Sequence, residues 1–111
     1  MIAVIFEVRP ADGRYLDLAA DLAPELDQVD GFVSIERFQS LADPGKLLSL
    51  SFWHNEEAVR AWRNRPHHRE VQAEGRAGVL HDYRLRVAAV LRDYGLERRE
   101  EAPEDSRAVH S

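Results

Sequence analysis

The chain has 111 residues, 44% hydrophobic and 32% charged, a balance that suits one globular domain with a single core. The absence of cysteine excludes disulfides, thiolate metal sites and thiol nucleophiles, and the net charge of -5 is spread without a basic stripe, so we expect no nucleic-acid partner. No apolar run approaches the ~20 residues that cross a bilayer, and the amino terminus lacks the pattern of a signal peptide, so we expect no membrane contact and a cytoplasmic location.

Hydrophobic periodicity predicts four strands and two helical regions in chain order. The strands are expected at residues 2–8, 32–40, 46–54 and 82–93, and the helical regions at residues 14–28 and 56–75. We expect Pro24 to kink the first helix, Gly31 to stop it, Asn55 to cap the second and Pro66 to break the second near residue 64. The Ala-Asp-Pro-Gly turn at residues 42–45 predicts a hairpin. Dense charge after residue 95 predicts a domain of residues 1–95 followed by a flexible tail of residues 96–111.

Alternation divides each predicted strand into two faces. Along the first strand, one face holds Ile2, Val4, Phe6 and Val8. Along the second, Phe32, Ser34, Glu36 and Phe38 lie opposite Val33, Ile35, Arg37 and Gln39. Along the third, Leu48, Leu50, Phe52 and His54 lie opposite Leu47, Ser49, Ser51 and Trp53. Along the last, Tyr83, Leu85, Val87 and Ala89 lie opposite Arg84, Arg86, Ala88 and Val90.

The order of strands and helices predicts an α+β fold of the ferredoxin-like βαββαβ type. In this fold a four-stranded antiparallel sheet carries its two helical regions on one face. The strands have apolar side chains on both faces, and an open apolar face of several hundred Å² is uncommon on a soluble monomer. We therefore expect a homodimer in which sheet packs on sheet.

Three segments carry a resemblance to a known family, namely DGFVSIERFQS, LLSLSFWHNEEAVRAWRNRPHHREVQ and DYRLRVAAVLRDYG. Together they resemble the antibiotic biosynthesis monooxygenase family, small ferredoxin-like proteins that dimerise through their sheets. The resemblance extends over about residues 2–95. It implies a fold, a dimer and a pocket between helices and sheet. Members include cofactor-independent oxygenases, quinol oxygenases and haem-degrading enzymes.

The candidate catalytic set is Trp62, which the resemblance implies, together with one of the histidines, His68 in preference to His67, and one of the arginines, Arg84 or Arg86, with Arg84 chosen. Trp62 stands where family oxygenases keep a pocket tryptophan, the His68 imidazole titrates near neutral pH and can accept a proton, and Arg84 can hold an oxyanion. Candidate substrate-binding residues are Phe6, Phe52, Trp53, His54, His67, Tyr83 and Arg86.

Each candidate also has a purely structural interpretation. Trp62 can be core, and Trp53 can be a pocket wall or a dimer contact. The histidines can form a polar helix start, and because they are adjacent they should point about 100° apart. The arginines can pair with Glu7 or Glu36. No pair of histidines has the spacing of a metal site, so no metal is expected.

Two departures separate the chain from well-understood members of that family. Haem-degrading members typically carry an asparagine in the first strand and a histidine ten residues after the tryptophan, where this chain has Glu7 and Gln72. Polyketide oxygenases often place an asparagine one turn before the tryptophan, where this chain has Ala58.

Two functional hypotheses follow from the resemblance. The first is a cofactor-independent monooxygenase acting on an electron-rich aromatic such as a hydroquinone, an anthrone or a polyketide-like molecule. The alternative is a non-catalytic, haem- or aromatic-ligand-binding stress-response module of the same fold. A space beside Trp62 filled by Phe6, Phe52 and Leu85 would count against both.

Overall fold

The structure has the predicted strands and helical regions in the predicted order, but the last strand runs from Leu80 to Ala89 and not to residue 93 as predicted. The computed structural model describes residues 1–110, apart from the side chains at positions 74 and 75. The strands are β1 (Ile2–Pro10), β2 (Phe32–Gln39), β3 (Leu47–Trp53) and β4 (Leu80–Ala89). The helices are α1 (Arg14–Leu26), α2 (Glu56–Arg63), α3 (Pro66–Glu74) and α4 (Glu104–Val109). A π-helical turn, η1 (Gly75–Val79), leads from α3 into β4.

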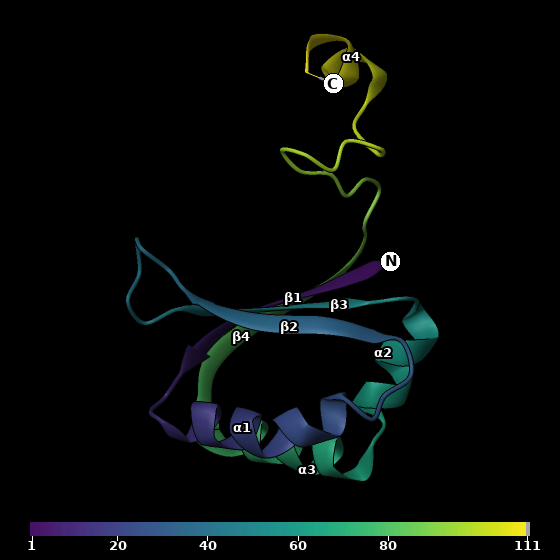
Figure 1. Cartoon of the computed structure of the whole chain (residues 1–111). Coiled ribbons are helices and arrows are strands. Elements are labelled where there is room, and N and C mark those ends of the chain that lie inside the picture. Colours follow the sequence, from purple (N-terminus) through teal and green to yellow (C-terminus); the bar gives the residue numbers. More distant parts are fainter. Residues whose placement is uncertain (111) are drawn as a thin grey trace.

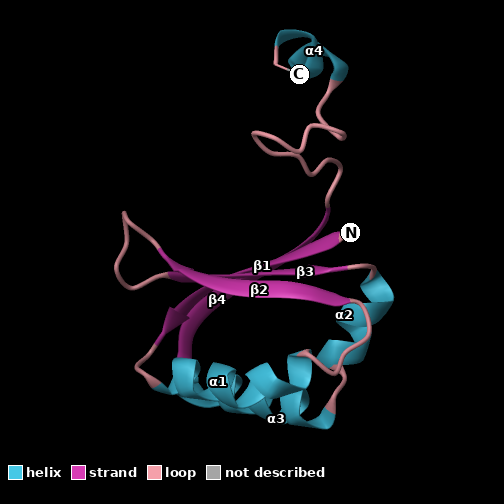
Figure 2. Ribbon diagram, in the orientation of Figure 1, coloured by secondary structure: helices cyan, strands magenta, loops and turns pink. Residues whose placement is uncertain are grey.

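The four strands form one antiparallel sheet in the order β2-β3-β1-β4. Helices α1 and α3 lie on one side of this sheet, and α2 joins its end to α3 (Figure 1). Figure 2 shows the same two layers, with strands above and helices below. This arrangement confirms the predicted ferredoxin-like α+β fold.

Strand register assigns each side chain to one of two faces, because residues directly opposite each other share a face. The inner face, which looks toward α1 and α3, is identified by Trp53, which packs against Leu26 and Val59 of the helices. It holds Ile2, Val4, Phe6 and Val8 of β1, Ser49, Ser51 and Trp53 of β3, and Tyr83, Leu85, Val87 and Ala89 of β4. The outer face holds Ala3, Ile5 and Glu7 of β1, Leu48, Leu50 and Phe52 of β3, and Arg84, Arg86 and Ala88 of β4.

The predicted alternation fails at one place, the start of β2. The register shifts between Phe32 and Ser34, so that Phe32 pairs with Trp53 and Ser34 with Phe52. A bulge of this kind adds one residue to a strand and exchanges the faces beyond it. Phe32 and Ile35 therefore both pack on the core, whereas strict alternation had placed them on opposite faces.

The helix boundaries follow local chemistry. Asn55 caps α2 as predicted, its Oδ1 accepting from the Ala58 amide at 3.0 Å. Pro66 separates α2 from α3 as predicted and supplies the first residue of the new helix. Helix α1 ends at Leu26, two residues before the predicted end at residue 28, and its C-cap is Asp27, so Gly31 is not the residue that stops it. Gly31 instead forms the turn into β2 with φ of 90°.

We expect Gly31→Ala to destabilise the fold by about 1–3 kcal/mol. An added Cβ would meet the Ala58 Cβ at 2.8 Å, and the backbone angle is one that alanine rarely adopts. The matched control is Gly13→Ala, because nothing lies within 4 Å of a Cβ built there and φ is -69°. Urea unfolding measures both variants, and equal stabilities would contradict the steric argument.

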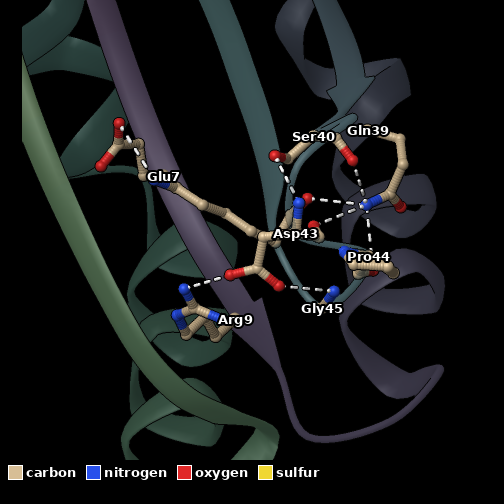
Figure 3. Close-up of polar contacts among 8 residues, drawn as sticks. Glu7, Arg9, Gln39, Ser40, Asp43, Pro44 and Gly45 are labelled. Atoms are coloured by element: carbon tan, nitrogen blue, oxygen red, sulfur yellow. Dashed lines mark hydrogen bonds and ion pairs between the residues drawn. The ribbon is translucent and has the colours of Figure 1, made fainter.

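The β2–β3 hairpin confirms the turn predicted at residues 42–45 and is fixed by side chains (Figure 3). Gln39 Nε2 donates to the carbonyls of Pro44 and Lys46, both at 2.9 Å. Asp43 Oδ1 accepts from the Gly45 amide at 3.0 Å, while its other oxygen pairs with Arg9 of β1. The Arg9 guanidinium holds the pKa of the Asp43 carboxyl below its usual value. The turn is thereby tied to the centre of the sheet.

Beyond β4 the chain leaves the sheet on the side away from α1 and α3, and it ends in α4, which the sequence did not predict (Figure 1). Arg99 holds this segment together, because its Nη2 donates to Ser106 Oγ at 2.7 Å and to the His110 carbonyl at 3.1 Å. The division at residue 95 into domain and flexible tail stays a prediction. Among the described residues, no helix has the length and apolar character needed to span a membrane.

Candidate active site

A row of aromatic rings runs from the core to the helix junction. Trp53 is only 1% exposed, and its Nε1 donates to Ser51 Oγ at 2.9 Å. Phe32 meets it edge-on at 5.2 Å, and the Trp62 ring lies 6.4 Å away on the other side. Trp53 is therefore a core residue, whereas the sequence suggested a pocket wall or a dimer contact. Trp62 is half-buried and packs against the core cluster.

His68 completes the row beside Trp62. The two ring centroids lie 4.8 Å apart with planes at 76°, an edge-to-face contact. The Pro66 break produces this contact, because it starts α3 in a new direction two residues before His68. Burial lowers the pKa of His68, and the nearby charge of Arg69 lowers it further, while Glu25 opposes both. The imidazole is consequently neutral at pH 7 and able to accept a proton.

His67 points elsewhere, as expected for neighbours on a helix. Its Nδ1 lies 3.3 Å from Glu25 Oε1 on α1. The other carboxylate oxygen lies 4.0 Å from Arg65 Nε. Glu25 thus joins α1 to the start of α3. No local sequence signal marks Glu25, because nothing along the chain connects position 25 with position 67.

Two buried polar atoms at this junction lack hydrogen-bond partners. They are Glu25 Oε2 and His68 Nδ1. Buried polar atoms are almost always paired in native proteins, so an unpaired one calls for an explanation. Here one belongs to His68, whose ring contacts Trp62, and the other to Glu25, whose charge acts on the His68 imidazole.

The inner face of β1 and β4 presents apolar surface toward the helices without being covered by them. Tyr83, Leu85 and Val87 keep exposed fractions of 48%, 52% and 44%. Phe6 lies among them, 5.6 Å from the Tyr83 ring and 6.3 Å from the Tyr15 ring of α1. We call Phe6, Tyr83, Leu85 and Val87 the inner apolar surface. These side chains therefore do not fill the space between the sheet and the helices. Phe52, which was expected to help fill that space, lies on the outer face of the sheet.

The structure does not bring the predicted arginines to the side of Trp62 and His68. Arg84 and Arg86 lie on the outer face, as their shared alternation predicted, opposite Glu7 and Ile5 of β1. Arg86 Nη1 lies 3.4 Å from Glu7 Oε2, one of the structural uses considered for it. Partial burial raises the pKa of Glu7, but Lys46 and Arg86 outweigh it and lower that pKa overall. The remaining candidate, His54, is exposed at the end of β3.

An arginine that the sequence did not single out does lie on the inner side. Arg37 pairs with Ser49 across β2 and β3, which places it on the inner face. Its Nε lies 3.5 Å from the Tyr15 hydroxyl, and its guanidinium lies 6.0 Å from that ring. Among the described residues no carboxylate is within ion-pair distance of it. Arg37 is two residues from Ile35 and shares its face of β2. The sequence pattern alone would have identified Arg37 if it had shown that the helices cover this face.

No cluster of three His, Cys, Asp or Glu side chains suited to a metal ion occurs in the part of the chain that the structure describes. Haem does not fit between Trp62 and His68, because ring centroids 4.8 Å apart leave no space for a macrocycle.

Comparison with known proteins places these features in context. The model of the family described as antibiotic biosynthesis monooxygenase matches residues 1–74. The chain is 48% identical over 93 residues to jasmonate monooxygenase ABM of Pyricularia oryzae, a match over 81% of this chain and 43% of that protein. The chain therefore spans less than half the length of that relative.

Two solved structures have a similar fold. Rv0793 of Mycobacterium tuberculosis superposes with a TM-score of 0.75 at 21% identity, covering 85% of this chain and 98% of that one. SnoaB, a cofactor-independent oxygenase from Streptomyces nogalater, superposes with a TM-score of 0.72 at 12% identity, covering 83% and 94%.

Proposed function

Because the chain belongs to the antibiotic biosynthesis monooxygenase family, we propose that it is a monooxygenase that uses dioxygen without flavin or metal. Its substrate is an electron-rich aromatic such as a hydroquinone, an anthrone or a polyketide-like compound. The substrate lies against the inner apolar surface, where flat rings can pack on Phe6 and Tyr83 and reach Trp62. The similarity in fold to SnoaB supports a reaction of this type.

One observation carries the proposal: a neutral imidazole held edge-on against a tryptophan. Burial keeps His68 unprotonated at pH 7, which is the state a general base needs. Trp62 beside it offers an aromatic face and an N–H group. The two side chains can hold an aromatic substrate and remove its proton in one place.

The reaction balances without an added reductant. For an anthrone, His68 takes a proton from the ring CH2, and the carbanion gives one electron to dioxygen. The substrate radical and superoxide then combine through a new C–O bond, and His68 returns its proton to the peroxide. Loss of water breaks the O–O bond and leaves a ketone. All four electrons come from the substrate, one oxygen atom enters the product, and the other leaves as water.

Arg37 is better placed than Arg84 to steady the oxyanion that the base creates. It lies on the inner face and has no carboxylate partner among the described residues, whereas Arg84 lies on the other side of the sheet. We expect Arg37→Ala to lower kcat/KM about 100-fold. Arg84→Ala, the matched control, should change it less than about threefold. Steady-state kinetics gives kcat/KM for both variants. A larger loss in Arg84→Ala than in Arg37→Ala would assign the role of steadying the oxyanion to Arg84.

The jasmonate monooxygenase relative suggests a second class of substrate, a ketone that carries a carboxylate. Arg37 could bind that carboxylate as a paired donor. Hydroxylation of a C–H bond, however, consumes two electrons more than such a substrate supplies. This candidate therefore requires a reductant, and the two classes differ in what must be added to the assay.

Oxygen uptake tests the proposal directly. Purified protein is offered a panel of hydroquinones and anthrones without cofactor, and jasmonate with and without NADPH. Uptake with an aromatic substrate alone, giving one product oxygen from 18O2, supports the proposal. No uptake with any aromatic would sink it, and uptake only with jasmonate plus NADPH would favour the second class.

The non-catalytic alternative predicts binding without turnover. A haem titration with a Soret shift that His68→Ala abolishes, and with no ring opening under reductant, would support it. The spacing of Trp62 and His68 argues against haem between them, so we expect no shift that depends on His68.

A second copy of the chain is the proposed partner. The outer face presents Ile5, Leu48, Leu50 and Phe52 together, only half-buried in one chain. Packing two such faces would remove this apolar surface from water. Sedimentation velocity should give a dimer, and Leu50→Glu should give a monomer. A monomeric wild-type protein would refute this partner.

A further inference from the structure

We propose that Glu25 is a positioning residue that holds His68 in the Nδ1–H tautomer and leaves Nε2 free as the proton acceptor. The proposal rests on the proposed function for its catalytic meaning, but it concerns the resting protein and can be measured without a substrate.

The first observation is the pair of unsatisfied atoms. Glu25 Oε2 and His68 Nδ1 are the buried side-chain atoms without partners in the described part of the chain. An ionised carboxylate can only accept hydrogen bonds, whereas a neutral imidazole has one nitrogen that donates and one that accepts. A proton on Nδ1 turns that nitrogen into a donor. The two atoms do not bond each other directly, but with Nδ1 protonated a single bridging water would give both of them a partner.

The second observation is the way Glu25 is held. Its Oε1 faces His67 Nδ1 at 3.3 Å, and Arg65 Nε stands 4.0 Å from Oε2. These contacts fix the carboxylate at the start of α3, one residue from His68. The groups with charge around the imidazole are Glu25 from α1, Arg65 before the helix, and His67 and Arg69 on α3 itself. Among these groups, Glu25 is the one carboxylate, so it is the acceptor available for a hydrogen bond from an imidazole N–H.

The chemistry explains why this tautomer matters. With Nδ1–H directed at Glu25, the Nε2 lone pair is the only basic site left on the ring. A carboxylate behind an imidazole also stabilises the imidazolium that forms when a proton is taken up. Glu25 would thus set both the direction and the strength of the base without touching substrate.

Nitrogen NMR of 15N-histidine-labelled full-length protein tests the proposal at pH 7.5. The expected spectrum of the wild type shows His68 with Nδ1 protonated and Nε2 unprotonated, the opposite of the preference of free histidine. A wild-type His68 that is protonated at Nε2 overturns the proposal.

Two variants at Glu25 separate positioning from support of the fold. Glu25→Leu removes the acceptor, so His68 should revert to the Nε2–H form. Glu25→Gln keeps an acceptor oxygen but loses the charge, so Nδ1–H should persist while the pKa of His68 falls by about one pH unit. Loss of Nδ1–H in the Gln variant to the same degree as in the Leu variant would contradict the tautomer assignment.

His67→Gln is the matched control, because it removes the histidine that faces Glu25 but keeps the carboxylate. His68 should stay in the Nδ1–H form in this variant, and a switch to Nε2–H would show that the junction as a whole, and not Glu25, sets the tautomer. The readout is independent of turnover. If the spectrum is as expected but no substrate consumes oxygen, the proposed function fails and the role of Glu25 in orienting the imidazole stands.

Discussion

Replacing His68 by alanine should lower kcat with an anthrone or hydroquinone substrate about 100- to 10,000-fold, the range that a lost general base costs. The imidazole is neutral at pH 7 because burial disfavours its charged form. Its pKa lies below the ordinary value, so the rate of the wild type should stay level as the pH falls to about 6.5 and should decline only below that. Initial rates of oxygen uptake measured between pH 5 and 8 give both quantities.

His81→Ala is the control for this experiment, since His81 is exposed at the start of β4. It should leave kcat within about twofold of the wild type. Added imidazole should restore part of the activity to His68→Ala, because a free base can enter the space of the missing ring. A His68→Ala protein with nearly full activity would remove His68 from the mechanism.

Replacing Trp53 by alanine should lower the free energy of unfolding by about 3–5 kcal/mol, a large share of the stability of a domain this size. The side chain is 1% exposed and touches the cluster formed by Leu26, Val29 and Val59. Its loss would leave a cavity that the sheet and helices cannot easily close, and Ser51 Oγ would lose its donor. Urea unfolding followed by circular dichroism measures the change.

The neighbouring tryptophan provides the comparison. Trp62 is only half-buried, so Trp62→Ala should cost less stability, about 1–2 kcal/mol, while it lowers activity. The two variants thus separate a core tryptophan from a site tryptophan. Equal losses of stability would mean that Trp62 also serves mainly as core.

The sequence predicts the sheet and its strands well, because each strand has its own alternating pattern. It does not predict which face the helices cover. On β3 the alternatives are a row of Leu48, Leu50 and Phe52 and a row of Ser49, Ser51 and Trp53, and hydrophobicity alone favours the first. The helices cover the second. Phe52 and Arg84, both expected at the site, therefore lie on the outer face, whereas Arg37 lies on the inner face.

The site itself is only partly visible in the sequence. Trp62 and His68 follow from local signals, namely the helical stripe and the proline break. Glu25 does not, because its contact with His67 joins helices that are far apart in the chain. The bulge beside Val33 is equally hidden, since nothing in the residues Phe32 to Ser34 marks an extra position.

The strand order carries a consequence for how the protein is made. β1 is made before β3 and β4, which flank it in the sheet, so its two partners become available only after about residues 53 and 89 have been synthesised. Until β3 emerges, β1 has two unpaired edges, and until about residue 89 emerges one edge of β1 stays unpaired and Phe6 has no neighbour in Leu85. Such distant pairing makes folding slow and exposes the early strand to association with other chains. The position of β1 in the sheet therefore predicts that the nascent chain is prone to association until β4 has been made.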